Sequence, residues 1–295
     1  MFKPNLANPP DGPIFFPKLY SYKLDGIRVL TKFGTTLTRT LKPVPNLHIR
    51  EMLEKYPGLD GEVIVGSPVA NDVCRKSMSA ISTIEGEPEF TFYVFDKLDC
   101  DLPFEDKYKL LLEESMSWPP YILLLSQTLV ECKEDADSFY AFALDMGYEG
   151  AMARNPKAKY KFGRSTAKSQ DLLKLKEHHD DEAVIESVYE AMHNENEATI
   201  DELGHTKRSS HQENLVPAGM IGGFNVLYKG TRFKVAPGKI SHDERKALWQ
   251  IRDTLVGKKV KFRAMAYGQK DAPRQGRALG VPEGVFLTIR EDFDI

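Results

Sequence analysis

Residues 23–28 read Lys-Leu-Asp-Gly-Ile-Arg, and this stretch decides how the chain is interpreted. It joins two apolar segments, residues 20–23 and 27–32, which are predicted to be strands. A lysine amine is protonated and inert at neutral pH unless burial, a neighbouring cation or a metal lowers its pKa. Taken alone, the stretch fits two structures: a nucleophilic lysine beside a phosphate, or an exposed strand and turn with Asp-Gly at the bend.

The side chains of this stretch suit phosphoryl chemistry. Lys23 would be the nucleophile, and Asp25 can orient its amine or a later nucleophile. Gly26 would let the backbone turn tightly beside a bound phosphate, and Arg28 can fork onto phosphate oxygens. In the first of the two structures Lys23 and Asp25 would be the catalytic residues, whereas in the second they would be ordinary residues of a turn.

Five further fragments follow in order along the chain. They are Thr-Arg-Thr at 38–40, Asp-Gly-Glu-Val-Ile-Val at 60–65, Phe-Tyr-Val-Phe-Asp at 92–96, Glu-Gly-Ala-Met-Ala-Arg at 149–154 and Leu-Leu-Lys-Leu-Lys at 172–176. Because side chains alternate along a strand, Tyr93 shares a face with Phe95, and Lys174 shares one with Lys176. Each fragment alone is ordinary strand sequence, so it is their joint occurrence that indicates a function.

Composition excludes several classes of protein. The 295 residues are 41% hydrophobic and 28% charged, which is typical of a globular chain and not of disordered, collagenous or coiled-coil ones. Three cysteines without a CxxC pair support neither a disulfide framework nor a cysteine-rich zinc site. No apolar run approaches the roughly 18 residues of a membrane span, and the N-terminus has no apolar signal core. We therefore expect a cytoplasmic protein without a membrane partner.

Although the net charge is −3, the sequence contains two basic stretches, residues 154–176 and 258–277. Each contains seven or more lysines and arginines against a single acid. Such stretches on a nearly neutral chain indicate a localised surface for a polyanion, although solvated strand faces would have the same composition.

Two domains are predicted, over residues 1–178 and 179–295. In the first, strands alternate irregularly with helices, which indicates an α+β fold. Composition then shifts at residues 177–182 (Glu-His-His-Asp-Asp-Glu), and about five strands with one helix follow, as in an OB-fold barrel. Residues 191–223 form a long polar segment with almost no apolar pattern, which is often a sign of a functional or disordered region.

The ordered set of fragments resembles the signature of covalent nucleotidyltransferases, which include ATP-dependent DNA and RNA ligases and mRNA-capping enzymes. Within that superfamily the chain is similar to the minimal two-domain ATP-dependent DNA ligases of large DNA viruses and phages. The likeness extends outside the catalytic motifs, to residues 38–43, 159–166 and 257–262. It implies a nucleotidyltransferase (ATP-grasp-like adenylation) domain followed by an OB-fold β-barrel domain, in enzymes of DNA replication, repair and recombination.

The resemblance implies a three-step reaction. Lys23 would attack the α-phosphate of ATP and hold AMP; the AMP would pass to the 5′-phosphate of a nick; and the adjacent 3′-hydroxyl would displace it, with Asp25 serving this last step. Phe95 would stack on adenine, with Tyr93 as the alternative. The implied nucleotide-binding set is Arg28, Arg39, Glu62, Phe95, Glu149, Lys174 and Lys176. Glu62 and Glu149 would also bind Mg²⁺, with Mn²⁺ as a substitute.

The resemblance also implies contacts with nicked double-stranded DNA. Arg28, Thr38 and Arg164 match positions that grip the 5′-phosphate of the nick. Residues 193–222 match a hairpin latch that closes around the duplex, with Lys207 and Arg208 as DNA contacts, and we expect it to be mobile without DNA. The protein would be a monomer that encircles the DNA.

The chain departs from the family pattern near its end. Arg274 is the predicted DNA-binding counterpart of an arginine in the last motif, although Arg277 fits the same position. The closing Asp-Lys of many ligases is absent after Arg290.

Three other functions are alternatives to an ATP-dependent DNA ligase. An NAD-dependent ligase is disfavoured, because only 22 residues precede Lys23 and a cysteine cluster is missing. An RNA ligase or capping guanylyltransferase would share the motifs. A non-catalytic nucleic-acid-binding protein could keep the scaffold, but it would be expected to have lost at least one of Lys23, Glu62, Glu149, Lys174 and Lys176.

Overall fold

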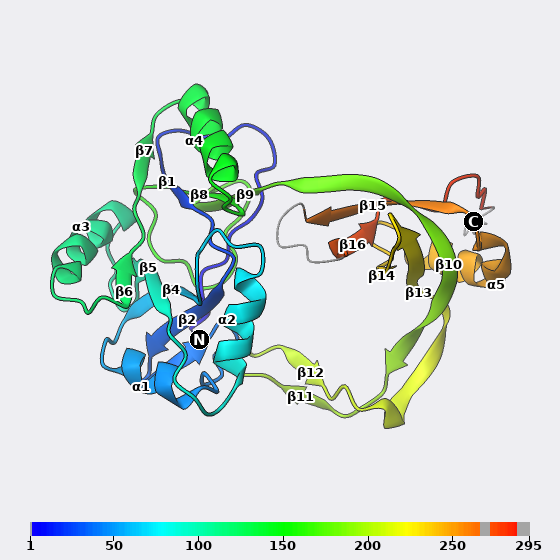
Figure 1. Ribbon diagram of the computed structural model, residues 1–295, viewed down its shortest axis with the longest axis horizontal. Helices are drawn as coiled ribbons and strands as arrows, with labels where there is room; N and C mark the ends of the chain where they lie inside the picture. Colours follow the sequence, from blue (N-terminus) through cyan, green and yellow to red (C-terminus); the bar gives the residue numbers. More distant parts are fainter. Residues whose placement is uncertain (1, 266–271, 288–295) are drawn as a thin grey trace, which may run out of the picture. The chain divides into compact units, whose positions relative to one another are not determined.

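The computed structural model describes residues 2–265 and 272–287. The chain forms two compact units, one built from Met1–Lys176 with Glu202–Gly204 and the other from Glu177–Asp201 and His205–Ile295 (Figure 1). No helix within the described ranges has both the length and the apolar composition of a membrane span.

The first unit contains a five-stranded sheet in the order β3-β2-β4-β5-β6. Its pairs are antiparallel except for β5 and β6, which are parallel. Helices α1, α2 and α3 contribute apolar side chains to the core of this sheet. The bounds are β2 (Ile27–Lys32), β3 (Thr35–Thr38), α1 (Leu47–Glu54), β4 (Leu59–Ile64), α2 (Val73–Ser82), β5 (Thr91–Lys97), α3 (Phe104–Ser115) and β6 (Ile122–Leu124).

The start of α1 shows how local sequence sets an element. Asn46 is fully buried, and its side-chain oxygen accepts a hydrogen bond from the Ile49 N–H at 2.8 Å. Ile49 and Leu53 then lie one turn apart and both enter the core. In the sequence, Asn46 precedes apolar residues at helical spacing, which predicts a capped helix here, and the structure confirms it.

A second, antiparallel sheet of the first unit has the order β7-β1-β8-β9. Its strands are β1 (Lys18–Tyr22), β7 (Thr128–Val130), β8 (Gly150–Arg154) and β9 (Leu172–Lys176), and α4 (Lys133–Asp145) packs on it through Ala136. Along β8, Ala151 and Ala153 enter this core. Met152 and Arg154 therefore point to the opposite face.

The N-terminal segment is fixed to the same sheet. Asn8 forms a parallel bridge with Leu173 of β9, and Leu6 forms another with Arg164. Backbone hydrogen bonds of 2.9 Å run from Leu6 N–H to the Gly163 carbonyl and from Lys174 N–H to the Asn8 carbonyl. This segment thus lies along residues that are more than 150 positions away in the sequence.

The second unit contains a five-stranded sheet in the order β14-β13-β10-β15-β16 with helix α5. Ala236, which follows β14, forms a parallel bridge with Arg277 of β16 at the opposite edge of the sheet. The spacing of Ser241 and Glu244 in the sequence predicts a capping box, and the two residues form one at the start of α5. The bounds are β10 (His178–Asn194), β13 (Leu215–Tyr228), β14 (Thr231–Val235), α5 (His242–Gln250), β15 (Lys259–Met265) and β16 (Arg274–Ala278).

The acidic run at residues 177–182 belongs mostly to β10, and it neutralises part of the second basic stretch. Asp180 pairs with Arg263 at 2.6 Å. Glu182 lies 3.5 Å from both Lys259 and Lys261 of β15. For these three cations the explanation is cross-strand charge pairing between β10 and β15.

The polar segment after β10 is a hydrogen-bonded hairpin of β11 (Ala198–Ile200) and β12 (Thr206–Arg208), followed by the short helix η1 (Gln212–Asn214) (Figure 1). Asn196 is 7% exposed and lies at its base. Its Nδ2 donates to the carbonyls of Ser209 at 3.2 Å and His211 at 2.9 Å. Side-chain amide bonds thus replace the apolar pattern that the segment lacks.

Two elements of the second unit differ from what the sequence predicts. Apolar Leu248 and Ile251 followed by Gly257 predict one helix up to that glycine, but α5 ends at Gln250 and the 3-10 helix η2 (Arg252–Leu255) follows it. The sequence also predicts a strand over residues 285–289; residues 285–287 form none, and 288–289 lie outside the described residues, as do Arg290 and the rest of the chain. Within the described residues the last strand of this sheet is β16.

Candidate active site

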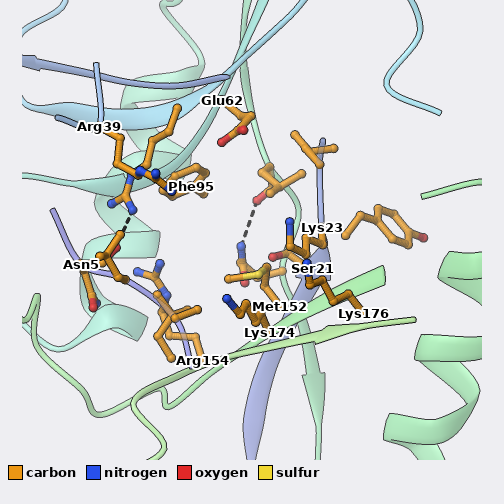
Figure 2. Close-up of a pocket in the computed structure, with 18 of the residues that line it drawn as sticks. Asn5, Ser21, Lys23, Arg39, Glu62, Phe95, Met152, Arg154, Lys174 and Lys176 are labelled. Atoms are coloured by element: carbon orange, nitrogen blue, oxygen red, sulfur yellow. Dashed lines mark hydrogen bonds between the residues drawn. The ribbon is translucent and has the colours of Figure 1, made fainter. Parts of the chain in front are cut away.

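A cavity of about 280 Å³ lies in the first unit, and side chains of both its sheets line the wall (Figure 2). The N-terminal segment contributes Asn5, Leu6 and Ala7. One carboxylate, Glu62, lines the cavity together with seven cations: Lys23, Arg28, Arg39, Arg154, Arg164, Lys174 and Lys176. This excess of positive charge favours a ligand that carries several negative charges.

Lys23 follows β1 and is held at both its backbone and its side chain. Its N–H donates to the Gly150 carbonyl at 2.9 Å. Its Nζ forms an ion pair with Glu149, which is 4% exposed, although the two residues are 126 positions apart. The Lys176 Nζ lies 3.9 Å from the other carboxylate oxygen. The amine is therefore aimed into the cavity wall where β1, β8 and β9 meet.

Lys174 and Lys176 lie on the same face of β9, as predicted. Burial lowers the pKa of Lys174, and the positive charges of Lys176, Arg164 and Lys23 lower it further. A bound anion would relieve this repulsion. The end of the cavity near Lys23 is thus suited to phosphate groups.

Glu62 of β4 lies opposite these lysines on the cavity wall (Figure 2). Burial raises the pKa of its carboxyl to about 7, against the pull of Lys23 and Arg28. The described residues contain no group of three or more His, Cys, Asp or Glu side chains that could hold a metal by themselves. Mg²⁺ is usually bound by one or two carboxylates together with substrate phosphates and water. Glu62, which lines the cavity, fits such a donor, whereas Glu149 is paired with Lys23 and Lys176 and is not part of the described lining.

Phe95 of β5 lines the cavity, whereas Tyr93 on the same strand face is absent from its lining. Both Tyr93 and Phe95 pack against the cluster that contains Leu24, Ile64 and Leu125, and of the two rings Phe95 is the one in the cavity lining. The position suits Phe95 as the aromatic surface for a base.

Arg28 is bound within the wall. Its Nε and Nη2 contact the two oxygens of Asp60 at 2.8 and 2.6 Å, and Nη2 also lies 3.2 Å from the Tyr160 hydroxyl. Burial opposes the charge of Arg28, but Asp60, which is fully buried, more than offsets this and raises its pKa. Most N–H groups of the Arg28 guanidinium thus form hydrogen bonds with other residues of the protein. The sequence did not indicate these bonds.

The remaining predicted residues have different locations. Arg39 and Arg164 are exposed and line the cavity, and Arg164 also donates to the Ala7 carbonyl at 3.0 Å. Asp25 is 7% exposed and Thr38 donates to the Lys42 carbonyl; within the described chain neither lines the cavity.

Three predicted DNA contacts belong to the second unit. Lys207 is an exposed residue of β12, and Arg208 donates to the Asn196 carbonyl. Arg274 begins β16, and Arg277 of the same strand forms the bridge to Ala236.

Sequence reasoning missed several lining residues, among them Asn5, Met152 and Arg154. Alternation along β8 could have found the last two, because Gly150, Met152 and Arg154 share a face. The Arg154 guanidinium is fixed by an ion pair with Asp96 and lies 4.1 Å from the Phe104 ring centroid. No sequence signal marked Asn5.

Residues 16–176 match the family described as ATP dependent DNA ligase domain. The chain belongs to this family. The predicted α+β nucleotidyltransferase fold and the resemblance to ATP-dependent DNA ligases are therefore confirmed.

A curated DNA ligase of Archaeoglobus fulgidus is 28% identical over 306 aligned positions, which cover 93% of this chain and 52% of that protein. The chain thus spans about half the length of that relative. The crystal structure of Chlorella virus DNA ligase-adenylate is 26% identical, covers 94% of this chain and 98% of that one, and has a TM-score of 0.54. A Lig E DNA ligase, 20% identical with a TM-score of 0.67 and coverage of 93% and 98%, shares the fold.

Proposed function

We propose that this chain is an ATP-dependent DNA ligase that seals 3′-hydroxyl/5′-phosphate nicks in duplex DNA through a lysyl-AMP intermediate. The observation that carries the proposal is the position of Lys23: its amine lies in a cavity with six other cations and with the aromatic ring of Phe95. Family membership supports the same reaction.

In the first step the Lys23 nitrogen attacks the α-phosphorus of ATP. A nitrogen–phosphorus bond forms, and the bond to pyrophosphate breaks. Glu149 already accepts a hydrogen bond from this amine, so it is placed to orient the nitrogen and to receive its proton. Lys174 and Lys176 neutralise the phosphate charge, and Arg39 contacts the ribose region. Glu62 would hold Mg²⁺, which supplies further neutralisation of the phosphates.

In the following steps AMP passes to the 5′-phosphate of the nick, and the 3′-hydroxyl then displaces it. Arg164 is exposed at the cavity and fits the 5′-phosphate contact, together with Thr38 and the remaining donor capacity of Arg28. Asp25 serves the step that uses the 3′-hydroxyl.

We propose an adenylyltransferase domain over residues 1–178 and an OB-fold domain over 179–295, in a monomer that encircles DNA. The latch is the segment 193–222, whose β11–β12 hairpin presents Lys207. Arg208 and Arg274 are the other proposed DNA contacts of this domain.

The reaction is tested with purified protein, α-labelled ATP and nicked duplexes. The protein should become covalently labelled by ATP, and not by GTP or NAD⁺, and should then seal nicked DNA. Labelling by GTP would indicate a capping guanylyltransferase, and sealing only of nicked RNA would indicate an RNA ligase. An absence of labelling would favour the non-catalytic binding protein.

The latch is tested by replacing residues 195–213 with a short glycine linker. Binding of nicked DNA should weaken and lose part of its dependence on salt, because cationic contacts with phosphates are removed. Labelling by ATP should continue, because no residue of this segment lines the described cavity. Loss of both activities would contradict the latch assignment.

A further inference from the structure

Arg154 of β8 is a cation of the cavity that the proposed reaction does not use. It lines the cavity, and its side chain is 11% exposed. In the register of β8 against β9, Met152 lies opposite Lys174, and Arg154 follows two residues further along the same face. Lys174 therefore lies between Lys176 and Arg154, and Figure 2 shows the three side chains in this order. Arg154 thus extends the row of cations on this wall.

The guanidinium of Arg154 has donors without a partner in the protein. Its Nη1 forms the ion pair with Asp96, and the ring of Phe104 covers one face of the group. Nε and Nη2 donate no hydrogen bond within residues 2–265 and 272–287, and neither is among the buried unpaired side-chain atoms of those residues. Both nitrogens are therefore accessible to solvent, and a ligand in the cavity can reach them.

Arg28 is also held by a buried aspartate, but its donors are occupied. Its Nε and Nη2 contact Asp60, and its Nη1 donates to the Asn5 carbonyl. All three nitrogens of Arg28 thus have a partner in the protein, whereas Arg154 keeps two for another molecule. Of these two arginines, Arg154 is the one that is free to bind a ligand through a nitrogen pair.

The formal charges around Arg154 do not balance. Asp96 is fully buried, and its two oxygens contact different cations: Oδ1 lies 2.5 Å from the Lys107 Nζ, and Oδ2 contacts Arg154. One carboxylate is thus shared by two cations. Because buried charges are normally paired, a second anion is expected at the accessible member of the group. The Lys107 side chain is 1% exposed, so that member is Arg154.

We propose that Arg154 is a phosphate-binding residue of the cavity, and that its Nε and Nη2 donate to phosphate oxygens of the substrate. The planar fork of a guanidinium matches a phosphate group, which also supplies the missing negative charge. This inference rests on the proposed function, which offers two sources of phosphate: ATP and the 5′ end of the nick. The two sources react in different steps, so they can be distinguished.

The test is Arg154→Met, which removes the fork and leaves Asp96 paired with Lys107. Labelling by α-labelled ATP is measured first, and the labelled protein is then mixed with nicked DNA to follow transfer of AMP. If Arg154 binds a phosphate of ATP, the KM for ATP should rise about tenfold and transfer should be unchanged. If it binds the nick, labelling should be unchanged, transfer should slow about tenfold, and the preference for a 5′-phosphate nick over a 5′-hydroxyl nick should be lost.

Lys107→Met is the matched control, because it removes the other partner of the same carboxylate and Lys107 is not part of the described cavity lining. Both steps should stay within about threefold of wild type. Urea unfolding shows whether each variant is folded. Arg154→Lys keeps the charge without the fork, and it should lose a smaller part of the same step.

A loss in either step that Lys107→Met does not share supports the inference. Equal losses in Arg154→Met and Lys107→Met would show that Arg154 only holds the wall together, and would overturn it. Wild-type rates of both steps in folded Arg154→Met would overturn it as well. If Arg154→Met does not fold, wild-type rates in Arg154→Lys decide the question in the same way. Failure of wild type to be labelled by ATP would instead refute the proposed function.

Discussion

Asp60 and Asp96 lie directly opposite each other on β4 and β5, and each holds one arginine of the cavity wall. Asp60 binds Arg28, and Asp96 forms an ion pair with Arg154. Both carboxylates are fully buried. Two neighbouring acids under the cavity thus fix two cations that would otherwise repel each other, and they keep this part of the wall in place without a ligand.

Asp60→Asn should destabilise the protein strongly. The variant leaves Arg28 in the wall without its charged partner, and removal of one member of a buried pair costs about 3–5 kcal/mol. Urea unfolding measures the change. The control Asp99→Asn removes a carboxylate that is 64% exposed and pairs with Lys32, so it should cost less than about 1 kcal/mol. Equal stability of the two variants would contradict the account.

Gly26→Ala should damage the fold around Lys23. A Cβ at residue 26 would lie 2.5 Å from the Val63 carbonyl oxygen and would also meet the Ile64 side chain. The close approach of β4 accounts for a glycine at this position. We expect a loss of about 1–3 kcal/mol in urea unfolding, as for an overpacked core. Gly280→Ala, where a Cβ meets nothing within 4 Å, should change stability by less than about 0.5 kcal/mol.

Glu62 should make stability fall as pH rises. Its pKa is raised from 4.5 to about 7, chiefly by burial, so the native state keeps a proton that the unfolded chain releases in this range. Glu62→Gln should therefore be more stable than wild type at pH 8, by up to about 3 kcal/mol, and should match it at pH 4. Urea unfolding at several pH values gives the difference. A constant difference across pH would show that the carboxyl titrates normally, and Glu51→Gln on the exposed side of α1 controls for general charge effects.

Much of the fold follows from local sequence. Apolar residues and flanking turns predict strands over residues 27–32, 150–154, 172–176 and 231–235, and β2, β8, β9 and β14 have these bounds. The sequence of β16, Arg-Gln-Gly-Arg-Ala, has no such pattern. This segment is a strand because it pairs with β15. The acidic start of β10 is likewise a strand because its backbone pairs with β15.

The candidate site was predictable where motifs carry it and hidden where distant contacts do. Lys23, Glu62 and Lys174 were identified from their fragments, and all three line the cavity. The pairing of Arg28 with Asp60 depends on the register of β2 against β4. Asn5 is placed by contacts of its segment with residues 160–163, about half the chain away, so its own neighbours in sequence do not indicate that it lines the cavity.

The most direct test of the central claim is the site of covalent labelling by α-labelled ATP. The label should reside on the peptide that contains Lys23, with the acid lability of a phosphoramidate, and Lys23→Ala and Lys23→Arg should form no adduct even when they are folded. An adduct that persists in either variant, or that maps to another residue, would contradict the account.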